Sequence, residues 1–196
     1  NNVNQNIIGL YSVIYSATDT YGNSSTATRT VSVNDIIAPV ITLLGDNPMT
    51  IEALSNYNDP GANAIDNYDN SVNVTSTGNV NTSIVGNYTI TYSASDSSGN
   101  TSTKTRTVKV VNTTAPTLII LGNNPYDLNV YTDFVDPGAT ATDAFGVSVN
   151  VSSTNNINKN VLGNYSVNYS ATDSYGNTQT ATRSVIVVDT TNPTIT

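Results

Sequence analysis

Apolar and polar residues alternate along two neighbouring stretches near the middle of the chain. From Tyr88 to Ala94 every second residue is apolar or aromatic, and valines alternate in the same way over 108–110. Successive side chains of a β-strand point to opposite faces, so this alternation predicts two strands with one buried face each. A Gly-Asn pair typical of turns lies between the stretches. We therefore predict a β-hairpin that is closed by the loop Asp96–Ser102.

The same hairpin sequence occurs three times, beginning at Gly9, Gly86 and Gly163. Each copy is offset from the next by 77 positions, and no insertion interrupts the offset. A fixed period of this kind indicates a tandem array of domains. We predict the second half of a repeat in residues 1–35, complete repeats in 36–112 and 113–189, and the start of a further repeat in 190–196. Because the chain begins and ends inside repeat units, we expect an excerpt from a longer array.

The first half of each complete repeat carries further strand and turn signals. Residues 49–55 and 126–132 each resemble a strand, and an Asp-Pro-Gly turn follows in both repeats. Alternating valines predict one more strand, at Val72 and Val74 and again at Val149 and Val151. No segment shows the apolar period of about 3.6 residues that marks a helix. Short strands separated by turns predict an all-β sandwich.

The connections between repeats are short and contain proline. Only a few residues separate the last strand of one repeat from the proline that opens the next, at Pro39, Pro116 and Pro193. Proline stiffens such a connector, so we expect successive domains to meet end to end with limited bending. The expected partners are therefore neighbouring repeats, or identical chains in a filament or array.

The inward faces of the two hairpin strands predict their register. Partners in an antiparallel pair lie on the same face of the sheet. This condition places Ile90 opposite Val108 and Tyr92 opposite Arg106. The same juxtaposition is expected for Tyr15 with Arg29 and for Tyr169 with Arg183. We expect each arginine to stack on its tyrosine ring near the end of the sheet, which is a packing role.

The composition excludes several classes of function. The chain has no Cys and no His, which excludes disulfides, tetrahedral zinc sites, haem and iron–sulfur centres. The formal net charge of −8 argues against nucleic acid as a partner. No apolar run approaches the roughly 20 residues needed to span a bilayer. Only 10% of the residues are charged and Asn, Thr and Ser supply the polarity, which favours an extracellular or cell-surface location.

Three segments of the repeat resemble the immunoglobulin-like repeat domains of bacterial surface proteins, which are related to hyalin repeats. They are the opening Pro39–Gly45, the middle Asp59–Asp66 and the close Thr105–Val110, each with a counterpart in the other complete repeat. The resemblance implies tandem immunoglobulin-like (Ig-like) β-sandwiches that serve as spacers, stalks or adhesive tips. It also implies a tyrosine corner, in which a tyrosine hydroxyl bonds back to the preceding loop, at Tyr11, Tyr88 and Tyr165.

Calcium is the cofactor for which the chain offers suitable ligands, because this ion binds carboxylate, amide and backbone oxygens. Asp96 and Asn100 lie in the hairpin loop, which in an Ig-like sandwich points toward the preceding domain and its linker residue Asp35. The acidic loop with Asp66 and Asp69 could approach the same junction. The equivalent ligands of the next repeat are Asp173 and Asn177, with Asn112 in the linker. A calcium ion there would lock neighbouring domains in line; the alternative is that Asp-x-x-Gly-Asn is turn chemistry without a metal.

The chain offers no repeated catalytic constellation, so we expect that it is not an enzyme. A serine nucleophile has no histidine base here, and the single glutamate, Glu52, is replaced by Asn129 in the next repeat. The sequence favours an extracellular structural array that forms a stalk, filament or matrix element of a surface protein. The alternative is an adhesin, with or without a calcium requirement, that binds a glycan or another cell surface through exposed tyrosines: Tyr21, Tyr68 and Tyr175.

Overall fold

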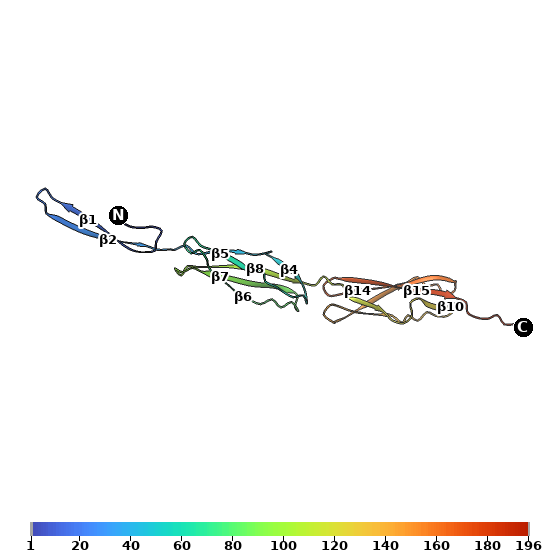
Figure 1. The fold of residues 1–196 in the computed structure, drawn as a ribbon. Helices are drawn as coiled ribbons and strands as arrows, with labels where there is room; N and C mark the ends of the chain where they lie inside the picture. The colour runs from blue at the N-terminus through green and yellow to red at the C-terminus, as the bar shows by residue number, and fades with distance from the viewer. Residues whose placement is uncertain (1, 196) are drawn as a thin grey trace. The chain divides into compact units, whose positions relative to one another are not determined.

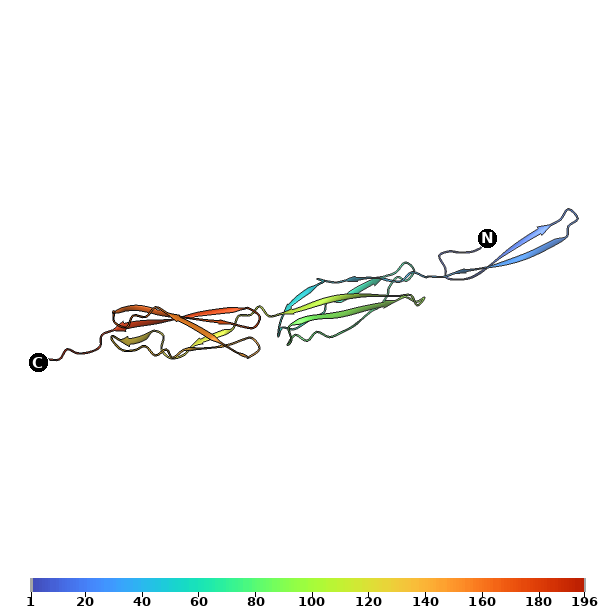
Figure 2. The ribbon, with the colours of Figure 1, turned by 180° about the vertical axis from the view of Figure 1, so that it is seen from behind.

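The computed structural model describes residues 2–195, and every regular element in that range is a β-strand (Figures 1 and 2). The chain divides after Val111 into two compact units. Within the described residues, no helix could serve as a membrane span. The first residue of the predicted segment 1–35 and the last residue of 190–196 lie outside the described residues.

The unit that ends at Val111 contains a hairpin and one sandwich. The hairpin pairs β1 (Gly9–Thr18) with β2 (Ser24–Val33) along their full lengths. The strands of the sandwich are β3 (Val40–Leu43), β4 (Met49–Glu52), β5 (Ala62–Ile65), β6 (Val74–Thr77), β7 (Gly86–Ser95) and β8 (Thr101–Val111). One sheet has the order β4-β8-β7-β6 and the other pairs β3 with β5. Only β4 and β8 run parallel; the other pairs are antiparallel.

The unit that begins at Asn112 contains the second sandwich, with the same topology except that its smaller sheet has a third strand. Its strands are β9 (Thr117–Ile120), β10 (Tyr126–Asn129), β11 (Ala139–Thr142), β12 (Ser148–Val149), β13 (Val151–Asn155), β14 (Gly163–Thr172) and β15 (Thr178–Val188). The sheets have the orders β10-β15-β14-β13 and β12-β11-β9, and β10 runs parallel to β15. The prediction of repeated all-β sandwiches is confirmed.

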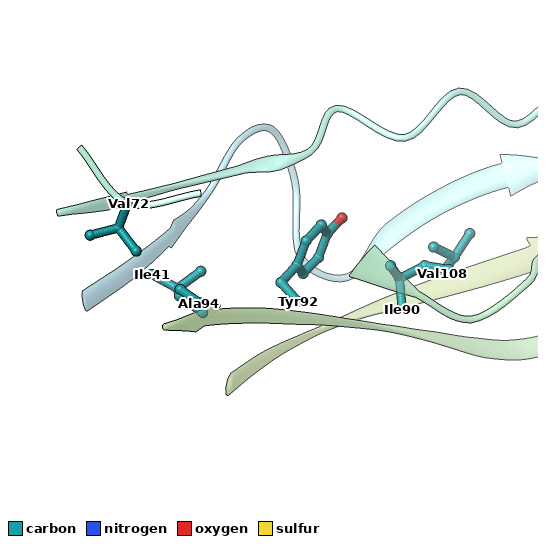
Figure 3. Packing of buried hydrophobic residues seen from close by; sticks show 6 residues of the cluster. All are labelled: Ile41, Val72, Ile90, Tyr92, Ala94 and Val108. Carbon is teal, nitrogen blue, oxygen red and sulfur yellow. The ribbon is translucent and has the colours of Figure 1, made fainter. Parts of the chain in front are cut away.

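Each sandwich buries its own apolar core between the two sheets. In the first sandwich the buried cluster is Ile41, Val72, Ile90, Tyr92, Ala94 and Val108 (Figure 3). The second cluster consists of Leu128, Val167, Tyr169, Val185 and Val187. Each large apolar side chain that is removed from water contributes about 1.5–3 kcal/mol to folding. The alternation seen in the sequence therefore supplies the inward face of the long β7–β8 and β14–β15 hairpins.

The predicted tyrosine corners are confirmed in all three copies. The hydroxyl of Tyr88 donates a hydrogen bond of 2.8 Å to the carbonyl oxygen of Ile84. The equivalent bonds join Tyr11 to Ile7 at 2.8 Å and Tyr165 to Val161 at 3.0 Å. Donor and acceptor are four residues apart in every case, so a short segment of sequence specifies the contact.

The predicted hairpin register is wrong by two residues. Ile90 pairs with Arg106 instead of Val108, and Tyr92 pairs with Lys104. The loop is shorter than predicted because Asp96 N–H donates to the carbonyl of Asn100 at 3.1 Å, so pairing begins directly outside these residues. The other copies show the same shift: Tyr15 pairs with Ala27, and Tyr169 with Ala181. A shift of two preserves the faces, which is why the inward sets were predicted correctly.

Two further strand predictions need correction. The strand predicted over 49–55 ends at Glu52, because the chain turns at Leu54 with a left-handed φ of 63°; in the second repeat the strand predicted over 126–132 ends at Asn129, and Tyr131 has a φ of 64°. The strand predicted at Val72 and Val74 is divided between the sheets, since Val72 bridges to Ala64 while β6 pairs with β7. Val149 and Val151 are divided in the same way, between β12 and β13.

Candidate functional site

The loop between β7 and β8 is built around the side chain of Asp96. One carboxylate oxygen accepts the backbone N–H of Asn100 at 2.7 Å, and the other accepts the Asn100 side-chain amide at 2.7 Å. The backbone N–H of Gly99 donates to the carbonyl of Asp96 at 3.3 Å, and Gly99 has a left-handed φ of 90°. These bonds explain the Asp-x-x-Gly-Asn pattern, and they hold a buried carboxylate at the end of the sandwich.

The linker residue Asp35 is brought to this loop. The side-chain amide of Asn100 donates to the backbone carbonyl of Asp35 at 3.3 Å. One carboxylate oxygen of Asp35 accepts the N–H of Ile37 at 3.2 Å, and the other is buried without a hydrogen-bond partner. The prediction that the loop approaches its linker is therefore confirmed for this contact.

Asp66, in the loop that follows β5, provides a third carboxylate. One of its oxygens accepts the backbone N–H groups of Tyr68 at 2.8 Å and of Asp69 at 3.1 Å. The hydrogen bond from Tyr68 is the main cause that lowers the pKa of Asp66, so this side chain is ionised at neutral pH. The other oxygen of Asp66 is buried and accepts no hydrogen bond.

The three carboxylates converge on one point. One oxygen from each of Asp35, Asp66 and Asp96 lies within 4.8 Å of the other two. Buried carboxylate oxygens that lack a partner are costly, and like charges this close repel one another. A cation relieves both penalties, and a set of carboxylate oxygens suits calcium. The carboxylates of Asp35, Asp66 and Asp96 are thus a candidate site for calcium.

The remaining predicted ligands of this repeat have other partners. Asp69 accepts hydrogen bonds from the backbone N–H and the hydroxyl of Ser97, at 2.6 Å and 2.9 Å. It therefore joins the two loops beside the carboxylate group instead of belonging to that group. Asn100 uses its amide nitrogen to hold Asp96 and Asp35 in place.

The second repeat has an amide where the first has a third carboxylate. Asn112 replaces Asp35 and donates its side-chain amide to Asp173 at 3.4 Å. Asn177 donates to the carbonyl of Asn112 at 3.2 Å and to Asp173 at 2.9 Å. Burial raises the pKa of Asp173, but the hydrogen bonds from Asn177 and from the backbone of Tyr175 and Gly176 together bring it below its ordinary value. A neutral amide satisfies the carboxylate here, and no group of three acidic side chains was found in this part of the described chain.

A second polar cluster, which the sequence only hinted at, lies inside each sandwich. Arg106 is completely buried. Its Nε donates to the hydroxyl of Tyr92 at 3.0 Å and lies 3.5 Å from a carboxylate oxygen of Asp59. The Tyr92 hydroxyl donates to the same carboxylate oxygen at 2.5 Å. The guanidinium also lies over the Tyr92 ring, 5.7 Å from its centroid, so the predicted juxtaposition holds on the diagonal of the ladder.

The terminal nitrogens of Arg106 are bound by backbone carbonyls. They donate to the carbonyls of Leu44 and Asp46, and at 3.0 Å to that of Gly61. The expectation of an arginine that merely stacks on a ring was therefore incomplete. The Asp-Pro-Gly turn, repeated at the same offset as the arginine and the tyrosine, was the signal that could have revealed this cluster.

The cluster is ionic but does not titrate near neutral pH. Burial raises the pKa of Asp59, but the hydrogen bonds from Tyr92 and from the backbone of Gly61, together with the positive charge of Arg106, lower it below its ordinary value. Burial and the charge of Asp59 raise the pKa of the neighbouring Tyr57 to about 12. The carboxylate thus stays charged and the hydroxyls stay protonated, which suits a fixed structural contact.

The sequence matches the family described as bacterial surface protein, Ig-like domain, over residues 1–33, 41–110 and 118–187. An uncharacterized 81.3 kDa protein of Acholeplasma phage L2 is 31% identical over 196 residues, with 92% of this chain and 26% of the relative covered. The chain thus spans about a quarter of the length of this curated relative.

Three solved structures are also similar. The lipoprotein BT2262 from Bacteroides thetaiotaomicron is 18% identical, with a TM-score of 0.35 and 76% of this chain and 80% of that chain covered. The M60 catalytic domain with the CBM51-1 and CBM51-2 domains from Clostridium perfringens ZmpB is 17% identical, with a TM-score of 0.42 and 95% and 34% covered. The protocadherin GammaB4 extracellular domain is 13% identical, with a TM-score of 0.37 and 94% and 39% covered.

Proposed function

Because the chain belongs to the bacterial surface protein Ig-like domain family, we propose that it is a structural repeat segment, in a stalk, filament or matrix element at the cell surface or outside the cell. In this role the repeats set a distance, and each one folds around its own core. Their partners are neighbouring repeats or identical chains. The low share of charged residues and the Asn-, Thr- and Ser-rich composition support an exposed location.

The observation that carries this proposal is the attachment of linker residue Asp35 to the repeat that follows it. Its carboxylate lies with Asp66 and Asp96, and two of the oxygens in this group are buried without partners. We propose that calcium binds here and joins the linker to both loops. A spacer needs linkers that are held against its repeats, and a metal bridge provides that restraint without a large interface.

The second repeat supports the same role with a different chemistry. Asn112 binds Asp173 through its amide, so this linker is attached without a metal. Asp173 and Asn177, although equivalent to proposed ligands of the first repeat, therefore attach linker residue Asn112 without a metal. The chain thus contains its own comparison between a calcium-dependent and a calcium-independent attachment.

Calcium is expected to stabilise the first complete repeat selectively. At a calcium concentration about a hundredfold above Kd, binding to the folded state adds roughly 2.7 kcal/mol, which raises the midpoint by roughly 10 °C or more. Thermal unfolding of the full chain in calcium and in EGTA measures this shift. Hydrogen exchange of β7 and β8 assigns it to the first repeat.

The control replaces Asp35 by the residue found at the equivalent position of the next repeat, which is asparagine. Asp35→Asn reproduces Asn112, so this variant should stay folded and lose its response to calcium. Asp189→Asn, at the next equivalent linker position, should respond to calcium as the unchanged chain does. A midpoint that is the same in millimolar calcium and in EGTA would contradict the calcium site.

An aromatic pair in the second repeat favours glycan binding as a second candidate function. The rings of Phe145 and Tyr175 are 5.8 Å apart, and Tyr175 is 47% exposed. Aromatic faces of this kind stack on sugar rings, with the hydroxyl as a polar contact. In the first repeat the position of Tyr175 is Ser98, so the pair is not repeated. A glycan array on which the chain binds and Tyr175→Ala does not would support an adhesin; no binding would leave the structural role.

A further inference from the structure

In each sandwich, the segment that runs from the end of the first strand through the second strand lies along the last strand. In the first sandwich this entering segment is 44–52 and the last strand is β8. In the first repeat β4 pairs in parallel with the end of β8, from Met49 with Val108 to Glu52 with Val111. The contact continues beyond the ladder, because the N–H of Ala53 donates to the carbonyl of Val111 at 2.6 Å. The second strand of the repeat, which follows β3 in the chain, is thus joined directly to the last strand.

The side chain of Asn47 extends this ladder by one further step. Its amide nitrogen donates to the carbonyl of Thr105 at 3.1 Å, and its amide oxygen accepts the N–H of Thr107 at 2.9 Å. These two bonds reproduce the pattern of a neighbouring strand on either side of Arg106. Asn47 therefore fastens the entering segment to β8 just before β4 begins.

Arg106 adds buried hydrogen bonds between the same two segments. It belongs to β8, and it donates to the carbonyls of Leu44 and Asp46 in the entering segment. Both carbonyls precede β4, and Asp59 supplies the opposite charge. Gly45, between the two carbonyls, has a φ of 69°, and a Cβ there would lie 3.1 Å from the Pro60 ring. The entering segment is thus shaped to present its carbonyls to one guanidinium.

This geometry determines how a pull on the two ends of a repeat is resisted. Force on the N-terminal side reaches the entering segment through β3, which pairs with β5, and then acts backward along β4. Force on the C-terminal side acts forward along β8, the exit strand. Because β4 and β8 are parallel, the two forces oppose each other along the strand axis, and all the bonds between them are loaded at once. Antiparallel terminal strands would instead open one bond at a time. The Arg106 and Asn47 contacts lie within the sheared region.

We propose that the buried arginine of each complete repeat is a mechanical clamp, which joins the entering segment to the exit strand and sets the resistance of the repeat to end-to-end tension. The biological use of such a clamp rests on the structural function proposed above. The clamp itself rests on contacts inside each sandwich, and calcium takes no part in them.

The second repeat contains the same clamp. Arg183 donates to the carbonyls of Leu121 and Asn123 and, at 3.2 Å, to that of Gly138. The Asn124 side chain bonds to the carbonyl of Thr182 at 3.2 Å and to the N–H of Ser184 at 2.9 Å. One contact differs: Lys104 donates to the carbonyl of Ile41 at 3.0 Å, whereas the equivalent residue is Ala181. The lysine contact is therefore specific to the first repeat, whereas both complete repeats have the arginine and asparagine contacts.

The test is force spectroscopy on the full chain, held by its two ends in EGTA. Asn47→Ala removes two sheared bonds without exposing a buried charge, and Arg106→Lys keeps the charge but loses the fork of donors. Each variant is expected to unfold the first repeat about tenfold faster or more at a fixed force, because the contacts that it removes join the entering segment to β8 and resist unfolding under load. The second repeat serves as the control in the same molecule, and Lys104→Ala should change the rate far less.

A change in the direction of pulling separates a clamp from general stability. The chain has no cysteine, so Asn87→Cys and Lys109→Cys provide two attachment points at paired, exposed positions of β7 and β8. Pulling there unzips the ladder and should need less force. Asn47→Ala should then have little effect. Equal sensitivity to this variant in both directions, or unchanged unfolding rates under end-to-end force, would overturn the proposal, whatever the calcium experiment shows.

Discussion

Arg183→Met is expected to lower the free energy of unfolding of the second repeat by about 3–5 kcal/mol, because it leaves one half of a buried ion pair without its partner. Arg183 is completely buried, and its Nε lies 3.6 Å from a carboxylate oxygen of Asp136. Its removal also deprives the Tyr169 hydroxyl and the surrounding carbonyls of their donors. Methionine can fill much of the space but can satisfy none of these groups.

Native-state hydrogen exchange of the full chain, in EGTA, measures the loss within β14 and β15. Arg29→Met is the matched control, since Arg29 holds the equivalent position in the first hairpin. There it is exposed and lies over the Tyr15 ring, 5.8 Å from the centroid. This variant should change stability by no more than about 0.5 kcal/mol, as is usual for surface positions. A similar, small effect of both substitutions would show that the buried arginine is dispensable for the fold.

Gly78→Ala is expected to destabilise the first repeat by about 2–4 kcal/mol, because it combines backbone strain with a steric clash. Gly78 has a φ of 119°, which side chains rarely adopt. A Cβ there would also lie 2.5 Å from the carbonyl oxygen of Thr89, on the neighbouring strand β7. A backbone atom cannot rotate away as a side chain can, so the edge of the sheet must shift.

Two substitutions separate these causes when thermal unfolding is followed. Gly99 has a φ of 90°, but a Cβ there would meet nothing within 4 Å. Gly99→Ala should therefore introduce only backbone strain, which lowers the free energy of unfolding by about 1 kcal/mol. Asn155 takes the place of Gly78 in the second repeat, at the end of β13, and Asn155→Ala should have little effect. Equal losses for Gly78→Ala and Gly99→Ala would mean that the clash is relieved without cost.

The parts of this protein that depend on near neighbours could be predicted from its sequence. The alternation from Tyr88 to Ala94 identifies a strand and its buried face, because a period of two is a local property of the extended chain. The tyrosine corners join residues four apart, as at Tyr88 and Ile84. Asp96 closes its own loop through Asn100, also four residues away. The offset of 77 positions then carries each local result to every copy.

Only the tertiary structure decided the contacts between distant segments. The pattern of faces is unchanged when one strand slides by two residues, so it could not distinguish Val108 from Arg106 as the partner of Ile90. The carbonyls that bind Arg106 lie about 45 to 62 residues away in the chain, and they are available only because the entering segment folds against β8.

The candidate metal site has the same origin. The sequence supplied its carboxylates, but Asp35, Asp66 and Asp96 are brought together by a linker and two loops. The fold likewise keeps Asp69 out of the group, because its carboxylate accepts hydrogen bonds from Ser97 instead. Local sequence therefore determined the strands, the turns and the repeat. The path of the chain determined which polar groups meet, because hydrogen bonds and ion pairs between distant residues depend on where the folded backbone places them.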